Sequence, residues 1–150
     1  MIVTHDIKGV LMATTRRAST IWTGSLTEGS GNVTFESSKL GTHPVTWAAR
    51  STEPEGVTSP EELVAAAHAT CFSMALSNGL SQGGTPPTEL NTSAEVDFQP
   101  GTGIVGIRLT VSGDVPGLDA AGFLAAAEAA KAGCPVSRAL SAVPITLTVE

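Results

Sequence analysis

The chain has 150 residues, the usual size of a single globular domain and short for two independent cores. Eight basic against 14 acidic residues give a formal charge of −6, which argues against nucleic acid as a partner. Its strictly apolar runs, such as Leu63 to Ala67, are far shorter than the roughly 18 residues of a membrane-spanning helix, so we expect no membrane span.

The first residues show neither a long hydrophobic stretch nor a signal-peptidase site of the A-x-A type. We therefore expect a cytoplasmic protein. Met12 is followed by Ala-Thr-Thr-Arg-Arg, which resembles a natural start. Residues 1–11 are accordingly predicted to be an N-terminal extension, and residues 12–150 a single domain.

Short β-branched and aromatic segments alternate with turn residues between Ser19 and Arg50. Ser-Thr-Ile-Trp-Thr-Gly and Val-Thr-Phe-Glu-Ser, separated by a Gly-Ser-Gly-Asn turn, predict a hairpin. Val45 to Arg50 is predicted to be a further strand, and a polar loop follows it from Ser51 to Ser59.

A helix is predicted to begin after Ser59, which precedes Pro60 and lies three residues before Glu62. These are an N-cap, a proline at the first helical position and the acid of a capping box. The helix is expected to reach about Leu80. It is apolar around most of its circumference, and such a helix is expected to be buried on nearly all sides.

The remaining elements alternate in type after a Gly/Pro-rich linker. Two antiparallel strands, a helix capped by Asp119, a short helix that begins after Cys134 and a last strand are expected at 91–98, 104–112, 120–132, 135–140 and 144–149. Strands, helix, strands, helix and strand in this order predict an α+β fold with a mainly antiparallel sheet.

The two cysteines are the first candidates for chemistry. Cys71 lies in the middle of the apolar helix, where burial would raise its pKa, so reactivity requires a nearby cation. Cys134 immediately precedes Pro135 at a helix N-terminus, where backbone N–H groups favour a thiolate. Structural packing remains an alternative for each of them.

Glu61 is the acid of the first turn that has no capping role. Ten helical residues separate it from Cys71, which is about 15 Å along the axis. The two can share a site if two copies of the helix meet antiparallel, so a common reaction predicts a dimer. His68 and Cys71 have a spacing that zinc ligands use, but no further His or acid stands at ligand spacing, so we expect no metal and assign His68 to helix packing against a carbonyl.

Two segments together resemble the OsmC/Ohr family of organic hydroperoxide reductases, of the OsmC branch. They are Thr-Ser-Pro-Glu-Glu-Leu-Val-Ala-Ala-Ala-His-Ala-Thr-Cys-Phe-Ser-Met-Ala-Leu-Ser at 58–77 and Ala-Lys-Ala-Gly-Cys-Pro-Val-Ser at 130–137. The similarity extends from Ile21 to Val149. It implies an intertwined homodimer in which sheets built from both chains wrap around two central helices, with two active sites at the interface.

The resemblance also implies the roles of four residues. Cys71 corresponds to the peroxidatic cysteine, Cys134 to the resolving cysteine, Glu61 to the site glutamate, and Arg50, by its position before the loop, to the site arginine. Arg50 would stabilise the Cys71 thiolate while Glu61 holds it in place. Apolar side chains near the site, expected to be Phe72, Met74 and Trp47, would favour alkyl hydroperoxides.

The expected activity is that of a thiol peroxidase in oxidative and osmotic stress defence, without metal, flavin or haem. Cys71 would become a sulfenic acid, Cys134 would close a disulfide onto it, and a small or protein-bound dithiol would reduce the pair. Two alternatives remain. A stress-associated binding protein with structural cysteines predicts thiols that do not react with hydroperoxide, and a thiol–disulfide redox module predicts fast exchange with protein thiols.

Overall fold

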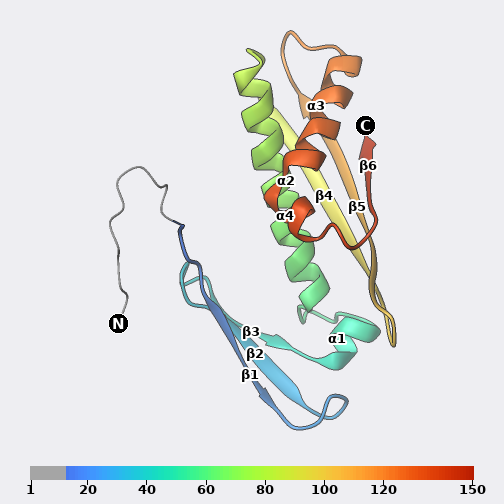
Figure 1. Cartoon of the computed structure of the whole chain (residues 1–150). Helices are drawn as coiled ribbons and strands as arrows, with labels where there is room; N and C mark the ends of the chain where they lie inside the picture. The colour runs from blue at the N-terminus through green and yellow to red at the C-terminus, as the bar shows by residue number, and fades with distance from the viewer. Residues whose placement is uncertain (1–12) are drawn as a thin grey trace.

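The computed structural model describes residues 13–150, and these form the expected α+β fold. The predicted N-terminal extension at 1–11 lies outside the described residues. Two three-stranded sheets are present, one before and one after a long helix (Figure 1). The first stands apart from the body that the second sheet makes with three of the four helices.

The N-terminal sheet consists of β1 (Ala18–Thr23), β2 (Ser30–Phe35) and β3 (Gly41–Val45), all antiparallel in sequence order. It confirms the hairpin expected in this region. Every residue of β1 is exposed, including Ile21 at 76% of its surface, and Val33 is the one buried apolar side chain of the sheet. A three-stranded sheet needs a covered apolar face to be stable, and Ile21 and Trp22 of this sheet remain exposed in the single chain.

The strand expected from Val45 to Arg50 is wrong. Val45 ends β3, and the chain turns into the short helix α1 (Trp47–Ser51). Thr46 has extended backbone dihedrals, and its hydroxyl accepts the backbone N–H of Ala49 at 3.1 Å, which is an N-cap. The cap and the helix-forming residues Ala-Ala-Arg outweigh the β-propensity of the preceding Val-Thr-Trp.

The long helix α2 (Pro60–Gln82) begins where predicted, with the Ser59 hydroxyl accepting the N–H of Glu62. The reciprocal half of the capping box is absent among the described contacts, because the Glu62 carboxylate accepts instead from the hydroxyl of Thr58 at 2.7 Å. The helix is also not buried on nearly all sides. Its buried residues follow one face, namely Glu61, His68, Phe72, Leu76 and Leu80.

By length and composition, α2 is the one helix in the described part of the chain that could cross a membrane, with a mean hydropathy of 1.2 in its most apolar window. The central helix of a globular protein has the same properties. Here its buried face packs against β4 and α3, whose bounds are given below.

The C-terminal sheet contains β4 (Glu89–Gln99), β5 (Gly103–Asp114) and β6 (Ile145–Val149). As expected, β4 and β5 form an antiparallel hairpin, whereas β6 runs parallel to β5. The helices α3 (Ala120–Gly133) and α4 (Pro135–Ala139) lie between β5 and β6 in sequence and confirm the two predicted helices.

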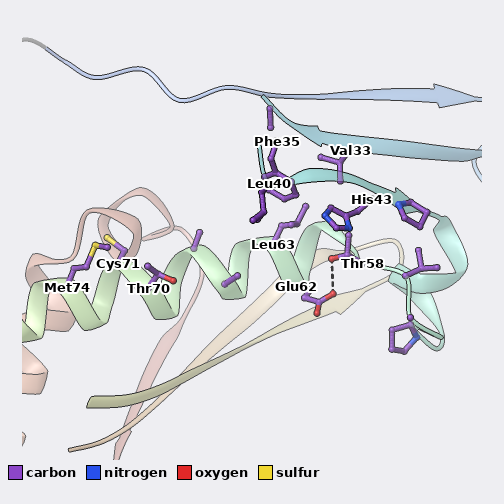
Figure 2. Close-up of a pocket in the computed structure, with 17 residues that line it drawn as sticks. Val33, Phe35, Leu40, His43, Thr58, Glu62, Leu63, Thr70, Cys71 and Met74 are labelled. Atoms are coloured by element: carbon purple, nitrogen blue, oxygen red, sulfur yellow. Dashed lines mark hydrogen bonds between the residues drawn. The ribbon is translucent and has the colours of Figure 1, made fainter. Parts of the chain in front are cut away.

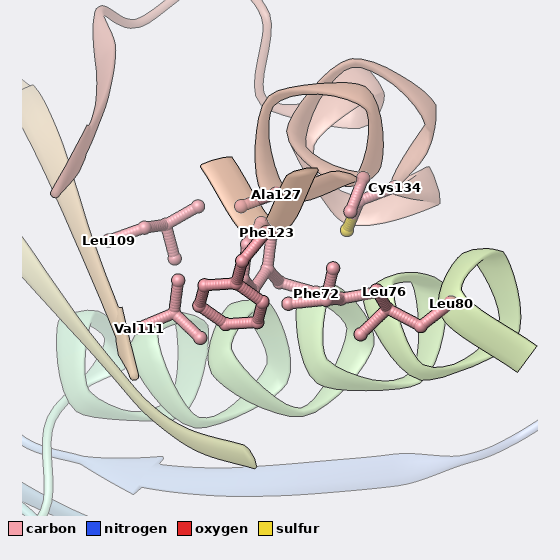
Figure 3. Packing of buried hydrophobic residues seen from close by; sticks show 9 residues of the cluster. Phe72, Leu76, Leu80, Leu109, Val111, Phe123, Ala127 and Cys134 are labelled. Atoms are coloured by element: carbon pink, nitrogen blue, oxygen red, sulfur yellow. The ribbon is translucent and has the colours of Figure 1, made fainter. Parts of the chain in front are cut away.

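One hydrophobic core joins these elements (Figure 3). Phe72 and Leu76 of α2 meet Leu109 and Val111 of β5, and α3 closes the cluster from the other side. Cys134, fully buried, belongs to this core, and its sulfur faces α2. The core therefore fixes the end of α3 and the start of α4 against the middle of α2.

Candidate active site

An arginine–glutamate pair lies where α1 meets the first turn of α2. The Arg50 guanidinium donates from Nε to both carboxylate oxygens of Glu61, at 2.9 and 3.2 Å, and its terminal nitrogen lies 2.9 Å from Oε1. The Glu61 side chain is 8% exposed and that of Arg50 is 31% exposed. This bidentate geometry orients a guanidinium more firmly than a single contact does.

Aromatic rings complete the support of Arg50. Its guanidinium carbon lies 4.1 Å from the centroid of the Phe98 ring, in the geometry of a cation–π contact. Trp47 meets the same ring edge to face, with centroids 5.8 Å apart. Sequence reasoning missed Phe98, which comes 48 residues after Arg50 and ends the β4 pattern without any local sign of a role.

The two cysteines lie together at a different place, between α2 and the start of α4. Both are free thiols, Cys71 packs against the core cluster that contains Cys134, and each thiol is close enough to shift the pKa of the other. Cys134 caps the end of α3, and α4 begins at Pro135, so the first turn of α4 lies beside the sulfurs, and its N–H groups help to lower the pKa of both thiols. The fold thus joins residues that are 63 positions apart in sequence.

The surroundings of the pair move the two pKa values in opposite directions. Burial raises the pKa of the Cys71 thiol, and the neighbouring Cys134 adds to this, while the Val136 N–H acts against it. Burial would also raise the pKa of Cys134, but hydrogen bonds from the Ser137 N–H, the Cys71 thiol and the Ser137 hydroxyl lower it. Within one chain, therefore, the thiolate of the pair is favoured on Cys134.

A large groove opens between α2 and the N-terminal sheet, with Cys71 at one end (Figure 2). Its volume is about 1140 Å³. Met74, 67% exposed, lies next to Cys71 at this end, whereas Thr58 and Glu62 lie at the other. The lining is mostly apolar: Val33, Phe35, Leu40 and Pro44 from the sheet side, and Leu63, Ala66, Ala67 and Met74 from α2.

The four predicted site residues therefore form two pairs rather than one cluster. Arg50 and Glu61 meet at the start of α2, Cys71 and Cys134 meet near its middle, and no contact joins the pairs within the described part of the chain. Ten residues of one helix separate Glu61 from Cys71. The two pairs therefore do not form one site within the described chain.

The apolar side chains expected near the site are only partly placed there. Met74 lines the groove beside Cys71 and Trp47 packs on Phe98, but Phe72 points into the core and is fully buried, so its predicted role near the thiol is wrong. Residues 71 and 72 are successive on a helix and cannot face the same side.

His68 also differs from expectation, because its Nε2 lies 2.7 Å from the Ser137 hydroxyl rather than from a carbonyl. Within residues 13–150 no group of three His, Cys, Asp or Glu side chains is placed to hold a metal ion.

The chain is similar to known proteins in both sequence and structure. Residues 53–150 match the family model for OsmC-like protein. Peroxiredoxin OsmC of Escherichia coli (strain K12) is 44% identical over 132 residues, covering 86% of this chain and 91% of the relative, and the protein of the same name from Shigella flexneri matches equally.

Solved structures share the fold at lower identity. An organic hydroperoxide resistance protein OsmC from Legionella pneumophila has a TM-score of 0.71 at 24% identity, covering 93% of this chain and 99% of that one. An OsmC-like protein from Mycoplasma pneumoniae has a TM-score of 0.70 at 14% identity, covering 93% and 98%. At these identities the structures support the fold only.

Proposed function

The chain belongs to the OsmC-like protein family and is a peroxidase of stress defence, and from that premise we propose that it reduces organic hydroperoxides with Cys71 and Cys134. The observation that carries the mechanism is the contact of these two thiols at the start of α4, with Cys71 open to the apolar groove. One sulfur is placed to meet substrate and the other to close a disulfide onto it.

The proposed reaction has two steps and a reset. The Cys71 thiolate attacks the distal oxygen of ROOH, the O–O bond breaks, and the alkoxide takes a proton and leaves as ROH. The Cys134 thiolate then attacks the sulfenic sulfur, the S–S bond forms, and hydroxide leaves and becomes water. An external dithiol restores both thiols by two exchange reactions and is itself oxidised to a disulfide.

The first step requires a cation near Cys71. Burial raises the pKa of this thiol, and an opposite charge close to the sulfur would reverse that. Arg50 is already fixed by the Glu61 carboxylate and the Phe98 ring, but it lies at the start of α2, far from Cys71 of the same chain. We therefore propose that Arg50 and Glu61 of one chain serve Cys71 of another.

The surface of the single chain supports such a homodimer. Ala66, Ala67, Thr70 and Met74 form an exposed stripe at helical spacing along α2. Across the groove, Leu40 and Pro44 are also exposed. A second α2, antiparallel to the first, would cover this stripe and bring the partner's first turn toward Cys71. In the proposed dimer α2 regains the all-round burial that its composition indicates.

The groove also supports the choice of substrate. An apolar wall beside Cys71, with Met74 at its edge, favours an alkyl or aryl group over the fully hydrated hydrogen peroxide molecule. No step of the proposed reaction uses a metal or organic cofactor. The dependence on reduced thiols fits a reducing compartment, and we propose a cytoplasmic location.

The proposal is tested by following cumene hydroperoxide consumption by the purified protein with a small dithiol present. We expect turnover in the wild type and none in Cys71→Ser. Cys134→Ser should complete a single oxidation and then accumulate overoxidised Cys71 or mixed disulfides, which mass spectrometry distinguishes. Turnover that persists in Cys71→Ser, or a wild type inactive with several dithiols, would reject the proposed mechanism, and the second result would favour a binding protein with structural cysteines.

A further inference from the structure

A second pair of side chains links α2 to α4 beside the cysteines. His68 is fully buried, Ser137 is 5% exposed, and the His68 Nε2 lies 2.7 Å from the Ser137 hydroxyl oxygen. A short hydrogen bond that is shielded from solvent is strong, and removing either side chain leaves the other without a hydrogen-bond partner. The peroxidase mechanism proposed above makes no use of it.

The spacing of this pair matches that of the cysteines. His68 comes three residues before Cys71 on α2, and Ser137 comes three residues after Cys134, in the first turn of α4. Residues three apart on a helix are neighbours on one face. The histidine–serine contact is therefore one turn away from the thiol–thiol contact along both helices, and it holds the two helices in the register that a disulfide requires.

The direction of the hydrogen bond follows from the other ring nitrogen. Nδ1 of His68 is buried and has no hydrogen-bond partner among the described residues. A buried N–H without an acceptor is rarer than a buried acceptor without a donor, so the proton belongs on Nε2, which donates to the Ser137 oxygen. Burial also lowers the pKa of His68, which keeps the ring neutral.

A serine oxygen that accepts from histidine keeps its own proton free to donate. The sulfur of Cys134 is the recipient that the fold places beside it: Ser137 follows Cys134 by three residues in the first turn of α4, and the hydroxyl and N–H of Ser137 help to lower the pKa of Cys134. Hydrogen bonds donated to a sulfur stabilise its thiolate form.

We propose that His68 and Ser137 are positioning residues for disulfide closure: His68 Nε2–H fixes the Ser137 hydroxyl, and that hydroxyl donates to Cys134 as its sulfur attacks oxidised Cys71. The inference rests on the proposed function, because it concerns the second step of that reaction, the closure of the disulfide. In that step the electron pair of the Cys134 thiolate forms the S–S bond, the S–O bond of the Cys71 sulfenic acid breaks, and hydroxide leaves with a proton from water.

The charged groups around the pair do not supply this effect. Arg138 of α4 is exposed, and Lys131 of α3 is held by Glu128 at 3.0 Å. On α2 the neighbouring titratable group is Cys71 itself, and the core strand β5 contributes only apolar side chains to this cluster. In the proposed dimer the added charge is the partner's Arg50, which faces Cys71.

The test isolates closure from the first oxidation. Reduced protein is mixed with one equivalent of cumene hydroperoxide, and the reaction is quenched at increasing times with a sulfenic-acid trap and analysed by mass spectrometry. The reaction is repeated between about pH 5 and pH 9, a range that includes the ordinary pKa of a thiol. Ser137→Ala should slow conversion of sulfenic acid to disulfide about tenfold at neutral pH, the effect of losing a hydrogen bond to a charged group, and should shift the closure profile to higher pH.

Conservative variants separate the hydroxyl from simple packing. Ser137→Thr, which keeps the hydroxyl, should restore closure and its pH profile, and His68→Gln, which keeps a side-chain N–H, should be closer to wild type than His68→Leu. The control is Ser73→Ala, which removes a half-buried hydroxyl of α2 that donates to the Ala69 carbonyl and to Thr92, and not to a cysteine.

Two results would overturn the inference: closure in Ser137→Ala at the wild-type rate and pH dependence, or Ser137→Thr as slow as Ser137→Ala. A wild type that forms no sulfenic acid at Cys71 would instead reject the proposed function itself, so the two failures are distinguishable.

Discussion

At the scale of single residues, Arg50 is held on two sides before any substrate arrives. Glu61 binds its guanidinium through two carboxylate oxygens, and the Phe98 ring lies against it at 4.1 Å from the guanidinium carbon. Such preorganisation reduces the entropy lost when the cation is used to stabilise a thiolate. The same contacts leave part of the side chain exposed, at 31%, so the cation remains available to another group.

Replacing Arg50 should therefore change the acidity of Cys71. Burial raises the pKa of this thiol, and we propose that the partner's Arg50 lowers it in the dimer. In a Cys134→Ser background, Arg50→Ala should move the pH of half-maximal iodoacetamide reaction upward and reduce the thiolate fraction at neutral pH, with Arg50→Lys in between. Arg17→Ala, an exposed arginine, is the control. An unchanged alkylation profile would remove Arg50 from the site.

The sequence allowed prediction of the residues whose roles are visible locally. Ser59 and Asp119 are helix caps with clear patterns, and the contexts of Cys71 and Cys134 are specific. Phe98 and the pair His68–Ser137 were not predictable as parts of a site, because their contacts join residues 48 and 69 positions apart that only the folded chain brings together.

At the scale of elements, α1 determines where Arg50 points. It has five residues, far fewer than an isolated helix needs, so its stability depends on its cap and its packing. Thr46 provides the N-cap. At the other end of the helix, the hydroxyl of Thr52 donates to the Ala48 carbonyl at 2.8 Å. The local sequence Val-Thr-Trp favours a strand, which is why pattern alone placed Arg50 at the end of one.

Removing the cap of α1 should reduce activity through Arg50. Thr46→Val keeps the shape of the side chain but loses the oxygen that accepts the Ala49 N–H. We expect a loss of about 1 kcal/mol in the free energy of unfolding, typical of an N-cap, together with a fall in kcat/KM for cumene hydroperoxide. Thr46→Ser should retain both. Denaturant unfolding and steady-state kinetics measure the two effects, and unaltered kcat/KM in Thr46→Val would show that α1 does not hold the arginine in place.

At the scale of the whole molecule, the arginine–glutamate pair and the cysteine pair do not meet within the described chain. Composition predicted a helix buried all round, and the chain buries only one face of α2. The order and type of most elements were predictable from local patterns. The separation of Glu61 from Cys71 was predictable only from their distance along one helix, which is ten residues. In the proposed dimer, a partner chain would cover the exposed faces of α2. The only local sign of that partner in the sequence is the apolar composition of the helix.

Mixed dimers test whether the active site is assembled from two chains. Cys71→Ser and Arg50→Ala chains are co-expressed in equal amounts with different tags, and peroxidase activity is compared with that of each variant alone. In a two-fold dimer, half of the molecules pair the two variants and regain one intact site, so we predict about one quarter of wild-type activity from two nearly inactive parents. Activity no greater than the average of the two parents would mean that each site lies within one chain and would reject the proposed two-chain site.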